Sequence, residues 1–425
     1  MKNISKNGFP ENFDWGAAFA SYQVSGCKNS NWSDWEHSEK RKNDLEESGE
    51  LKKHSLSNFL CGDACKHDKR FVSDFNLVKK LGHNSLRTGS EPGKIMPKKG
   101  VIDKKEIARI VKMVKHLNKL GIKIYWNLWH WTIPTWWQEE GGWESPHAIE
   151  YFTLYTNAVV NALAPLGVTH WITLNETNVF GKLSYEYGAW PPQLSDHARY
   201  EVVNDALVQA HIAAYKIIKK VCPQSFVGVA HALGHNEMTE ATAEQREWKE
   251  KEDEAWSRHF LEKIKDYQDF VGINHYRGSL FGGRPVTITN DLDWDMYPRA
   301  IYDTIMDVWK WYGKPIVITE NGCADDEDSR RPWFLWETLK WIQKAIEDGV
   351  PVLGYLHWSL MDNFEWAYGF WPRFGLIEID RENNLKRIPR KSAYLYRDII
   401  RYGLTDKVAK KYSDIIAYPQ NKKIV

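Results

Sequence analysis

Short apolar segments alternate with longer amphipathic segments along the whole chain. The apolar segments are rich in β-branched and aromatic residues and predict eight strands, at residues 15–20, 85–88, 123–128, 170–174, 226–231, 270–274, 316–319 and 352–357. Several of them are continuously apolar rather than alternating, which is typical of parallel strands covered on both faces. The pattern therefore indicates a largely parallel sheet whose strands are separated by helices.

The segments between these strands carry apolar residues at helical spacing. The clearest helix is predicted over 103–120, where Asp103 and Glu106 have the spacing of a capping box and Gly121 follows the last apolar residue. Further helices are predicted over 71–81, 202–221 and 332–347, and a highly charged one between 241 and 265.

The order of the elements favours one closed barrel. The strand starts are too irregularly spaced for a sequence repeat, and no Gly/Ser-rich or Pro-rich linker divides the chain. The length permits two or three ordinary domains, but eight unbroken β-α units are typical of a single eight-stranded parallel β/α (TIM) barrel. A doubly wound open sheet is the alternative, yet no Gly-rich phosphate loop follows the first strand. We expect one domain over residues 1–425.

Composition excludes several classes of function. The 425 residues include 57 basic and 56 acidic ones, so the net charge of +1 argues against a nucleic-acid partner. No apolar run approaches the ~18 residues needed to insert into a membrane. The N-terminus has no apolar segment after its lysines, which predicts no signal peptide and a soluble, cytoplasmic protein. No oligomeric state is indicated.

The cysteines suggest neither a disulfide framework nor a metal site. Their number, five, is odd for a framework in a long chain. Cys61, Cys65 and His67 lie close together and resemble a set of soft metal ligands, but no second Cys/His pair follows at finger spacing. We therefore expect no metal and no cofactor.

Candidate chemistry lies where the predicted strands end, because barrel enzymes build their sites at the C-terminal ends of strands. Glu176 follows the fourth strand and Glu320 the seventh. Either glutamate alone could be one half of an ion pair or lie at a helix N-terminus. Both together, among amide, His, Tyr and Trp side chains, match glycosidic cleavage, which needs one protonated and one ionised carboxyl group. The 22 tryptophans also suit sugar rings, although most are expected to fill the core.

Several longer motifs carry a resemblance to a known family. They are FPENFDWGAAFASYQVSG, TLNE, YGAWPPQ, GINHY, ITENG, HWSLMDNFEWAYGFWPRFGLIEID and RKSAY, which together run from about residue 9 to residue 396. The sequence resembles glycoside hydrolase family 1, the β-glucosidase and β-galactosidase family. The first and the sixth motif are the most specific, whereas TLNE or ENG alone is a weak signal.

The resemblance implies a role for each matching residue. Glu176 would be the acid/base and Glu320 the nucleophile, with Arg87, Asn175 and Tyr276 as their support. Contacts with the hydroxyls or the ring of the sugar would come from six residues, namely Gln23, His130, Asn175, Trp358, Glu365 and Trp366. The implied activity is that of a retaining β-glycosidase whose partner is a small-molecule β-glycoside.

Glu365 adds an expectation about the substrate. A carboxylate facing the 4- and 6-hydroxyls binds a neutral sugar but repels a 6-phosphate, which predicts unphosphorylated β-D-glucosides, galactosides or fucosides. Two rival activities remain. One is a transglycosidase, in which an alcohol captures the same intermediate, and the other is a sugar-binding barrel without turnover.

The sequence also departs from the family pattern. Thr177 stands where Pro is usual and Ser25 where Glu is usual, and His275 replaces a Tyr. Residues 91–94, Glu-Pro-Gly-Lys, stand where Glu-Trp-Ser-Arg is usual, and the stretch after Tyr276 is short. We expect a looser turn at Glu176 and a more open entrance that accepts bulky or alkyl aglycones.

Overall fold

Eight strands close into a barrel in the computed structural model, which describes residues 8–237, 242–280 and 288–419. Their order is β1-β10-β9-β7-β5-β4-β3-β2, and neighbouring strands pair in parallel. The strands are β1 (Asp14–Ala18), β2 (Ser85–Gly89), β3 (Lys123–Trp129), β4 (His170–Asn175), β5 (Phe226–Ala232), β7 (Phe270–Asn274), β9 (Ile316–Asn321) and β10 (Val352–Trp358). Each overlaps one predicted strand, so the predicted β/α barrel is confirmed.

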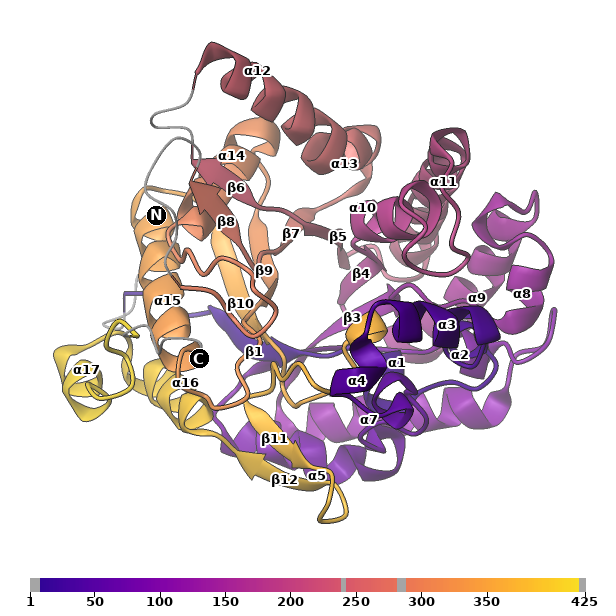
Figure 1. Ribbon diagram of the computed structural model, residues 1–425. Coiled ribbons are helices and arrows are strands. Elements are labelled where there is room, and N and C mark those ends of the chain that lie inside the picture. Colours follow the sequence, from indigo (N-terminus) through magenta and orange to yellow (C-terminus); the bar gives the residue numbers. More distant parts are fainter. Residues whose placement is uncertain (1–7, 238–241, 281–287, 420–425) are drawn as a thin grey trace.

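Helices surround the barrel, with one main helical segment after each strand (Figure 1). These are α5 (His67–Lys80), α7 (Lys104–Leu120), α9 (Ala148–Leu163), α11 (His197–Val221), α13 (His259–Ile264), α14 (Ala300–Tyr312), α15 (Arg331–Glu347) and α16 (Lys391–Tyr402). Their apolar faces pack on the strands, which are almost entirely buried. Burial on both faces explains why the strand sequences are continuously apolar.

Shorter elements lie in the loops. The helices are α1 (Ser21–Ser25), α2 (Asn31–Glu36), α3 (Glu39–Glu47), α4 (Glu50–Lys53), α6 (Pro92–Ile95), α8 (Thr135–Glu139), α10 (Thr177–Gly181), α12 (Ala243–Glu252) and α17 (Asp406–Lys411). Two small sheets pair β6 (His235–Glu237) with β8 (Gly278–Leu280) and β11 (Ile377–Asp380) with β12 (Lys386–Pro389). None of these four short strands was predicted, because three or four residues give too short a pattern.

The predicted helix ends are confirmed only in part. The Asp103 carboxylate accepts the N–H groups of Lys105 (2.7 Å) and Glu106 (3.2 Å), so it caps α7 as expected. The capping box is wrong, however, because the Asp103 N–H donates to the Ile95 carbonyl at 2.8 Å and the Glu106 carboxylate binds Arg109 instead. Helix α11 begins five residues before the predicted start, because its polar first turn shows no apolar period.

Two expectations fall partly on residues that are not described. Residues 1–7, part of the segment that predicts no signal peptide, lie outside the described residues, as does residue 241 of the charged helix. The rest of that helix forms α12, a π-helical segment over Asp253–Arg258, and α13. Within the described residues, no helix is both long and apolar enough to cross a membrane.

Candidate active site

The ten predicted site residues lie in, at or beyond the C-terminal parts of seven barrel strands. Arg87 lies within β2, Asn175 ends β4, Glu320 is the penultimate residue of β9, and Trp358 ends β10. The other six lie in the segments that follow β1, β3, β4, β7 and β10, namely Gln23, His130, Glu176, Tyr276, Glu365 and Trp366. Because all strands are parallel, these ends meet on one face of the barrel.

Glu320 is held by two donors from other strands. The Arg87 guanidinium donates to its Oε1 atom in a buried ion pair, and the Tyr276 hydroxyl donates to Oε2 at 2.5 Å. A second Arg87 nitrogen donates to the Asn175 side-chain carbonyl at 2.5 Å. Both oxygens of Glu320 therefore accept hydrogen bonds, one of them from a permanent cation, which favours the ionised carboxylate.

Glu176 lies in the turn between β4 and α10. Its backbone is left-handed (φ 43°, ψ 58°), a conformation that few residues other than glycine adopt, and its N–H donates to the Ala230 carbonyl at 2.7 Å. Among the described residues, its side chain accepts one hydrogen bond, from Asn274 at 2.8 Å. Asn274 also donates to the side-chain carbonyl of Asn175 at 3.1 Å, so hydrogen bonds link Glu176 to Glu320 through Asn274, Asn175 and Arg87.

The two carboxyl groups have different surroundings. Burial and the nearby Glu320 charge raise the pKa of Glu176 to about 8. The hydrogen bond from the Asn274 amide lowers that pKa, but its effect is the smaller one. Burial also raises the pKa of Glu320, but Arg87 and the Tyr276 hydroxyl counteract it. Near neutral pH the proton is therefore best placed on Glu176, because among the described residues Glu176 forms no ion pair, whereas Glu320 pairs with Arg87.

A third carboxyl group, Glu365, lies in the loop after β10 beside Gln23. The Gln23 amide donates to the Phe364 carbonyl (2.8 Å), the Asn363 side chain (3.1 Å) and Glu365 (3.4 Å). These contacts fix the orientation of the Gln23 side chain. Burial and the Glu320 charge raise the pKa of Glu365 to about 8. Glu365 is therefore protonated in the free site at neutral pH, which weakens the predicted repulsion of a 6-phosphate.

Aromatic rings form the wall next to these groups. The His130 ring lies nearly parallel to Trp358 (ring centres 6.0 Å apart) and to Trp366 (5.6 Å). Burial and Arg87 lower the pKa of His130 well below its usual value, so the imidazole is neutral. Its Nε2 atom lies 3.1 Å from the Asn175 amide, which joins the aromatic wall to the carboxyl groups. All ten predicted residues thus belong to one connected site.

Sequence reasoning missed residues that contact the predicted site residues and fix their orientation. Asn274 lies at a strand end, but the sequence analysis assigned it no role. Its side chain donates to Glu176 and accepts a hydrogen bond from the Thr319 hydroxyl at 2.6 Å. Tyr22 stacks on Trp366 at 5.7 Å, and its hydroxyl donates to the buried Glu36 at 2.8 Å. Position at a strand end was a usable signal for Asn274, whereas nothing in the sequence pattern pointed to Glu36.

The departures from the family pattern are partly explained by new contacts. Lys94 forms an ion pair with the Asp68 carboxylate at 2.5 Å, and the Ser25 hydroxyl accepts the Asp68 N–H at 3.1 Å. The two altered positions, 25 and 94, are therefore joined through Asp68. His275 is buried and both its ring nitrogens lack a partner among the described residues, and burial lowers its pKa to about 3. The looser turn expected at Thr177 stays a prediction.

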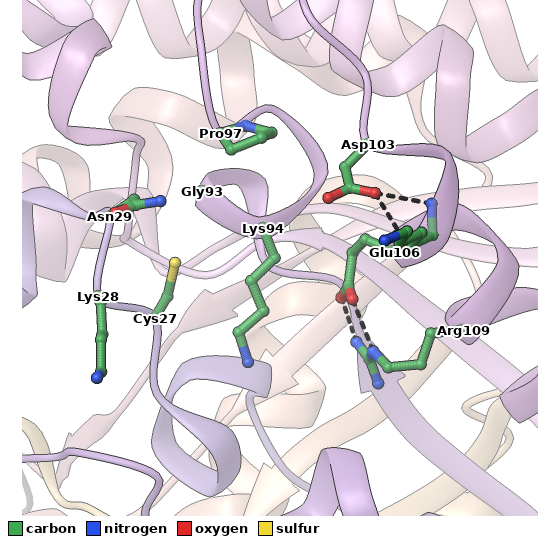
Figure 2. Close-up of a pocket in the computed structure, with 10 residues that line it drawn as sticks. Cys27, Lys28, Asn29, Gly93, Lys94, Pro97, Asp103, Glu106 and Arg109 are labelled. Carbon is green, nitrogen blue, oxygen red and sulfur yellow. Dashed lines mark hydrogen bonds and ion pairs between the residues drawn. The ribbon is translucent and has the colours of Figure 1, made fainter.

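A hollow of about 460 Å³, lined in part by charged side chains, lies next to this altered segment at the start of α7 (Figure 2). Its charged side chains are largely paired, because Lys94 binds Asp68, Arg109 binds Glu106 and Asp68, and Asp103 caps the helix. Because these charged groups already bind one another, the hollow offers few free polar groups to a ligand and receives no role.

The candidate metal ligands have other partners. The Cys61 and Cys65 thiols donate to the carbonyls of Tyr22 (3.4 Å) and Asp362 (2.9 Å), and His67 binds Asp74 at 2.8 Å. In the described part of the chain, no group of three or more His, Cys, Asp or Glu side chains is arranged to hold a metal ion. All five cysteines are free and buried.

Comparison with known proteins identifies the family. The sequence pattern of glycosyl hydrolase family 1 matches residues 5–266 and 282–403. The chain is 28% identical to β-glucosidase A of Acetivibrio thermocellus over 94% of its own length and 99% of the relative's, and 27% identical to a β-galactosidase of Pyrococcus woesei over 95% and 99%. The structure of a β-glycosidase from Pyrococcus horikoshii superposes with a TM-score of 0.82 at 30% identity, covering 97% of this chain and 98% of that one. The chain therefore belongs to glycosyl hydrolase family 1 and is a glycosidase.

Proposed function

We propose that this glycosidase hydrolyses unphosphorylated β-D-glucosides, galactosides or fucosides with retention of the anomeric configuration, and that residues 1–425 act as one catalytic domain. The observation that carries the proposal is the contrast between two linked, buried carboxyl groups. Within the described part of the chain, Glu320 accepts from Arg87 and Tyr276, whereas Glu176 accepts only from Asn274. Such a contrast gives one ionised and one protonated carboxyl group in a single site.

The first step uses both groups at once. The Glu320 carboxylate attacks the anomeric carbon while Glu176 gives its proton to the leaving oxygen, so that the glycosidic bond breaks and a glycosyl ester forms on Glu320. Proton transfer of this kind supplies roughly 10²–10⁴ in rate. Asn175 binds the 2-hydroxyl as charge develops on the sugar, a role supported by the Arg87, Asn274 and His130 contacts that fix its side chain.

The second step reverses the roles. Glu176, now ionised, takes a proton from water, and the water oxygen attacks the anomeric carbon and releases Glu320 as a carboxylate. Two displacements keep the β configuration. Gln23, His130, Glu365 and Trp366 bind the other hydroxyls, and the Trp358 ring supports the sugar face.

Neutral sugars remain the proposed substrates despite the protonated Glu365. A carboxyl group that is neutral in the free site can both donate to and accept from the 4- and 6-hydroxyls. A phosphate there would face the charge of Glu320, and among the described residues Glu365 is bound by the neutral Gln23 amide and by no cation. The more open entrance stays part of the proposal, and residues 281–287 of the shortened stretch lie outside the described residues.

Initial rates on the p-nitrophenyl β-D-glucoside, galactoside and fucoside test the proposal, with Glu320→Ala as the inactive control. We expect turnover by the parent protein, loss of turnover in the variant, and β-configured sugar as the first product by proton NMR. First-formed α-sugar would contradict retention, and binding without turnover would favour the non-catalytic alternative. Glycosides of added alcohols in place of free sugar would identify a transglycosidase.

A further inference from the structure

The peptide unit between Asn175 and Glu176 is hydrogen-bonded at both ends. The buried Trp131, which follows β3, donates its indole N–H to the Asn175 backbone carbonyl at 2.9 Å. The Glu176 N–H donates to the carbonyl of Ala230 on β5 at 2.7 Å. The carbonyl and the N–H belong to one planar unit, and β3 and β5 are the two neighbours of β4 in the barrel, so this unit is fixed from both sides.

The Trp131 indole is itself held in one orientation. Its ring centre lies 4.7 Å from that of Trp190, 4.7 Å from that of Trp366 and 4.9 Å from that of His130. Its backbone has φ 76°, a conformation that a bulky residue keeps only where the surrounding contacts enforce it. Trp131 therefore joins the aromatic wall to the backbone of the turn that contains Glu176.

That turn has few local restraints. Glu176 has a left-handed backbone (φ 43°, ψ 58°), and the next residue is Thr177, where the family pattern has proline. A proline would fix its own φ at about −65°, whereas threonine leaves that angle free. Among the described residues, the buried Thr177 hydroxyl has no hydrogen-bond partner and no side chain caps α10. The hydrogen bonds to the preceding peptide unit therefore matter more for the position of Glu176.

A shift of this peptide unit would move the proton donor and leave the nucleophile in place. The Glu176 side chain accepts one hydrogen bond within the described residues, from Asn274, so its position depends largely on its backbone. Glu320 is on β9 and is held by Arg87 and Tyr276. Proton transfer needs hydrogen-bond distance, and a misplacement of about 1 Å costs on the order of 100-fold in rate. Loss of the indole hydrogen bond should therefore weaken proton transfer selectively.

We propose that Trp131 is a positioning residue that, through the Asn175 carbonyl, holds Glu176 at hydrogen-bond distance from the leaving oxygen. The proposal rests on the proposed function, because it needs Glu176 to be the acid. Trp131 then affects the rate only as far as the leaving oxygen needs a proton. Glycosides of weakly acidic phenols depend on Trp131, and glycosides of strongly acidic phenols do not.

The variants remove the indole N–H with little change in volume. 3-Benzothienylalanine in place of Trp131 keeps both fused rings and replaces the N–H with sulfur, and Trp131→Phe is the second variant. The same two changes at Trp137 are the matched control, because Trp137 is buried and its indole N–H donates to the Gly142 carbonyl at 2.9 Å. Trp137 is on α8, which lies outside the barrel (Figure 1). The rings next to Trp137 are not site residues and belong to Trp136, Trp143 and Tyr151.

The measurement is kcat/KM on phenyl and on 2,4-dinitrophenyl β-D-glucoside. Phenol needs a proton to leave, whereas 2,4-dinitrophenol leaves as the anion, and kcat/KM reports the step in which either leaves. With each change at position 131, we expect the ratio of the phenyl value to the dinitrophenyl value to fall about 10–100-fold. The changes at position 137 should leave this ratio unchanged, because a merely structural loss lowers both values alike.

Glu176→Gln is the reference for loss of the acid. It should lower the same ratio further, by up to about 10⁴-fold. A lowered ratio in Glu176→Gln beside an unchanged ratio in the benzothienylalanine variant at position 131 would overturn the positioning proposal alone. An equal fall with the changes at position 137 would also overturn it.

The same data test the proposed function separately. An unchanged ratio in Glu176→Gln, or no turnover by the parent protein, would refute the role of Glu176 and with it the positioning proposal. Thermal unfolding checks that each variant is folded. If Trp131→Phe is not folded, the benzothienylalanine variant, which keeps the ring volume, decides the outcome.

Discussion

Replacing Tyr276 with phenylalanine removes one hydroxyl group and leaves the ring in place. That hydroxyl donates to Glu320 Oε2 at 2.5 Å, and a hydrogen bond to a charged group contributes about 1.5–3 kcal/mol. One pKa unit corresponds to about 1.36 kcal/mol, so the loss should raise the pKa of Glu320 by about 1–2 units. The sign is fixed, because the bond stabilises only the ionised form.

The pH profile of kcat/KM on p-nitrophenyl β-D-glucoside reads this change directly. Glu320 must be ionised to attack, so activity is lost as the pH falls through its pKa, and the acid limb should move to higher pH by about 1–2 units. At the optimum, kcat/KM should fall by about 10–100-fold. The basic limb, which reports Glu176, should move much less.

Tyr155→Phe is the matched control. The Tyr155 hydroxyl is buried and bonds the Ser90 hydroxyl (2.6 Å) and the Leu128 carbonyl (2.7 Å), so its loss should lower stability and leave the acid limb in place. An acid limb that stays within about 0.3 units of the parent in Tyr276→Phe would refute the assignment of Glu320 as the ionised group held by Tyr276.

Three further changes test other parts of the account. Glu176→Gln should lose the basic limb, expected near pH 8 from the raised pKa, and should retain more activity on glycosides with acidic leaving groups; an unchanged basic limb would contradict Glu176 as the acid. Glu36→Gln should reduce the pH dependence of stability, because burial raises the pKa of Glu36 to about 8 and stability is therefore lost as the pH rises from about 4.5 to 8. Urea unfolding at pH 5 and pH 8.5 should show a loss roughly 1–4 kcal/mol smaller than in the parent, and equal losses would refute this. Glu365→Gln should lower kcat/KM on the glucoside about tenfold and reduce the ratio of the glucoside rate to the 6-phospho-glucoside rate. An unchanged ratio would show that Glu365 does not discriminate between the two substrates.

The barrel could be predicted because its strands are covered on both faces. Continuous apolar runs such as residues 270–273 and 316–318 give a strong signal, and the observed strands differ from the predicted ones by two residues or fewer at either end. Short strands and polar first turns could not be found in this way. The start of α11 depends on the Asp196 side chain, which accepts the Ala198 N–H at 2.9 Å, a contact that apolar periodicity does not record.

The site could be predicted at the level of residues but not of partners. Strand ends and family motifs pointed to Glu176 and Glu320, whereas the donors around each carboxyl group depend on contacts between strands far apart in sequence. Asn274 and Glu176, for example, are 98 residues apart, and Arg87 and Glu320 are 233 apart. The raised pKa of Glu365 likewise depends on burial that no local pattern reveals.

The central claim is that Glu320 forms the covalent bond to the sugar. A glucosyl fluoride with fluorine in place of the 2-hydroxyl slows both displacements but carries a leaving group good enough for the first, so the glycosyl ester should accumulate. Intact mass and peptide mapping after brief incubation should then place one sugar on the peptide that contains Glu320, and none in Glu320→Ala. A sugar on Glu176, or a fully active protein with no adduct, would contradict the account.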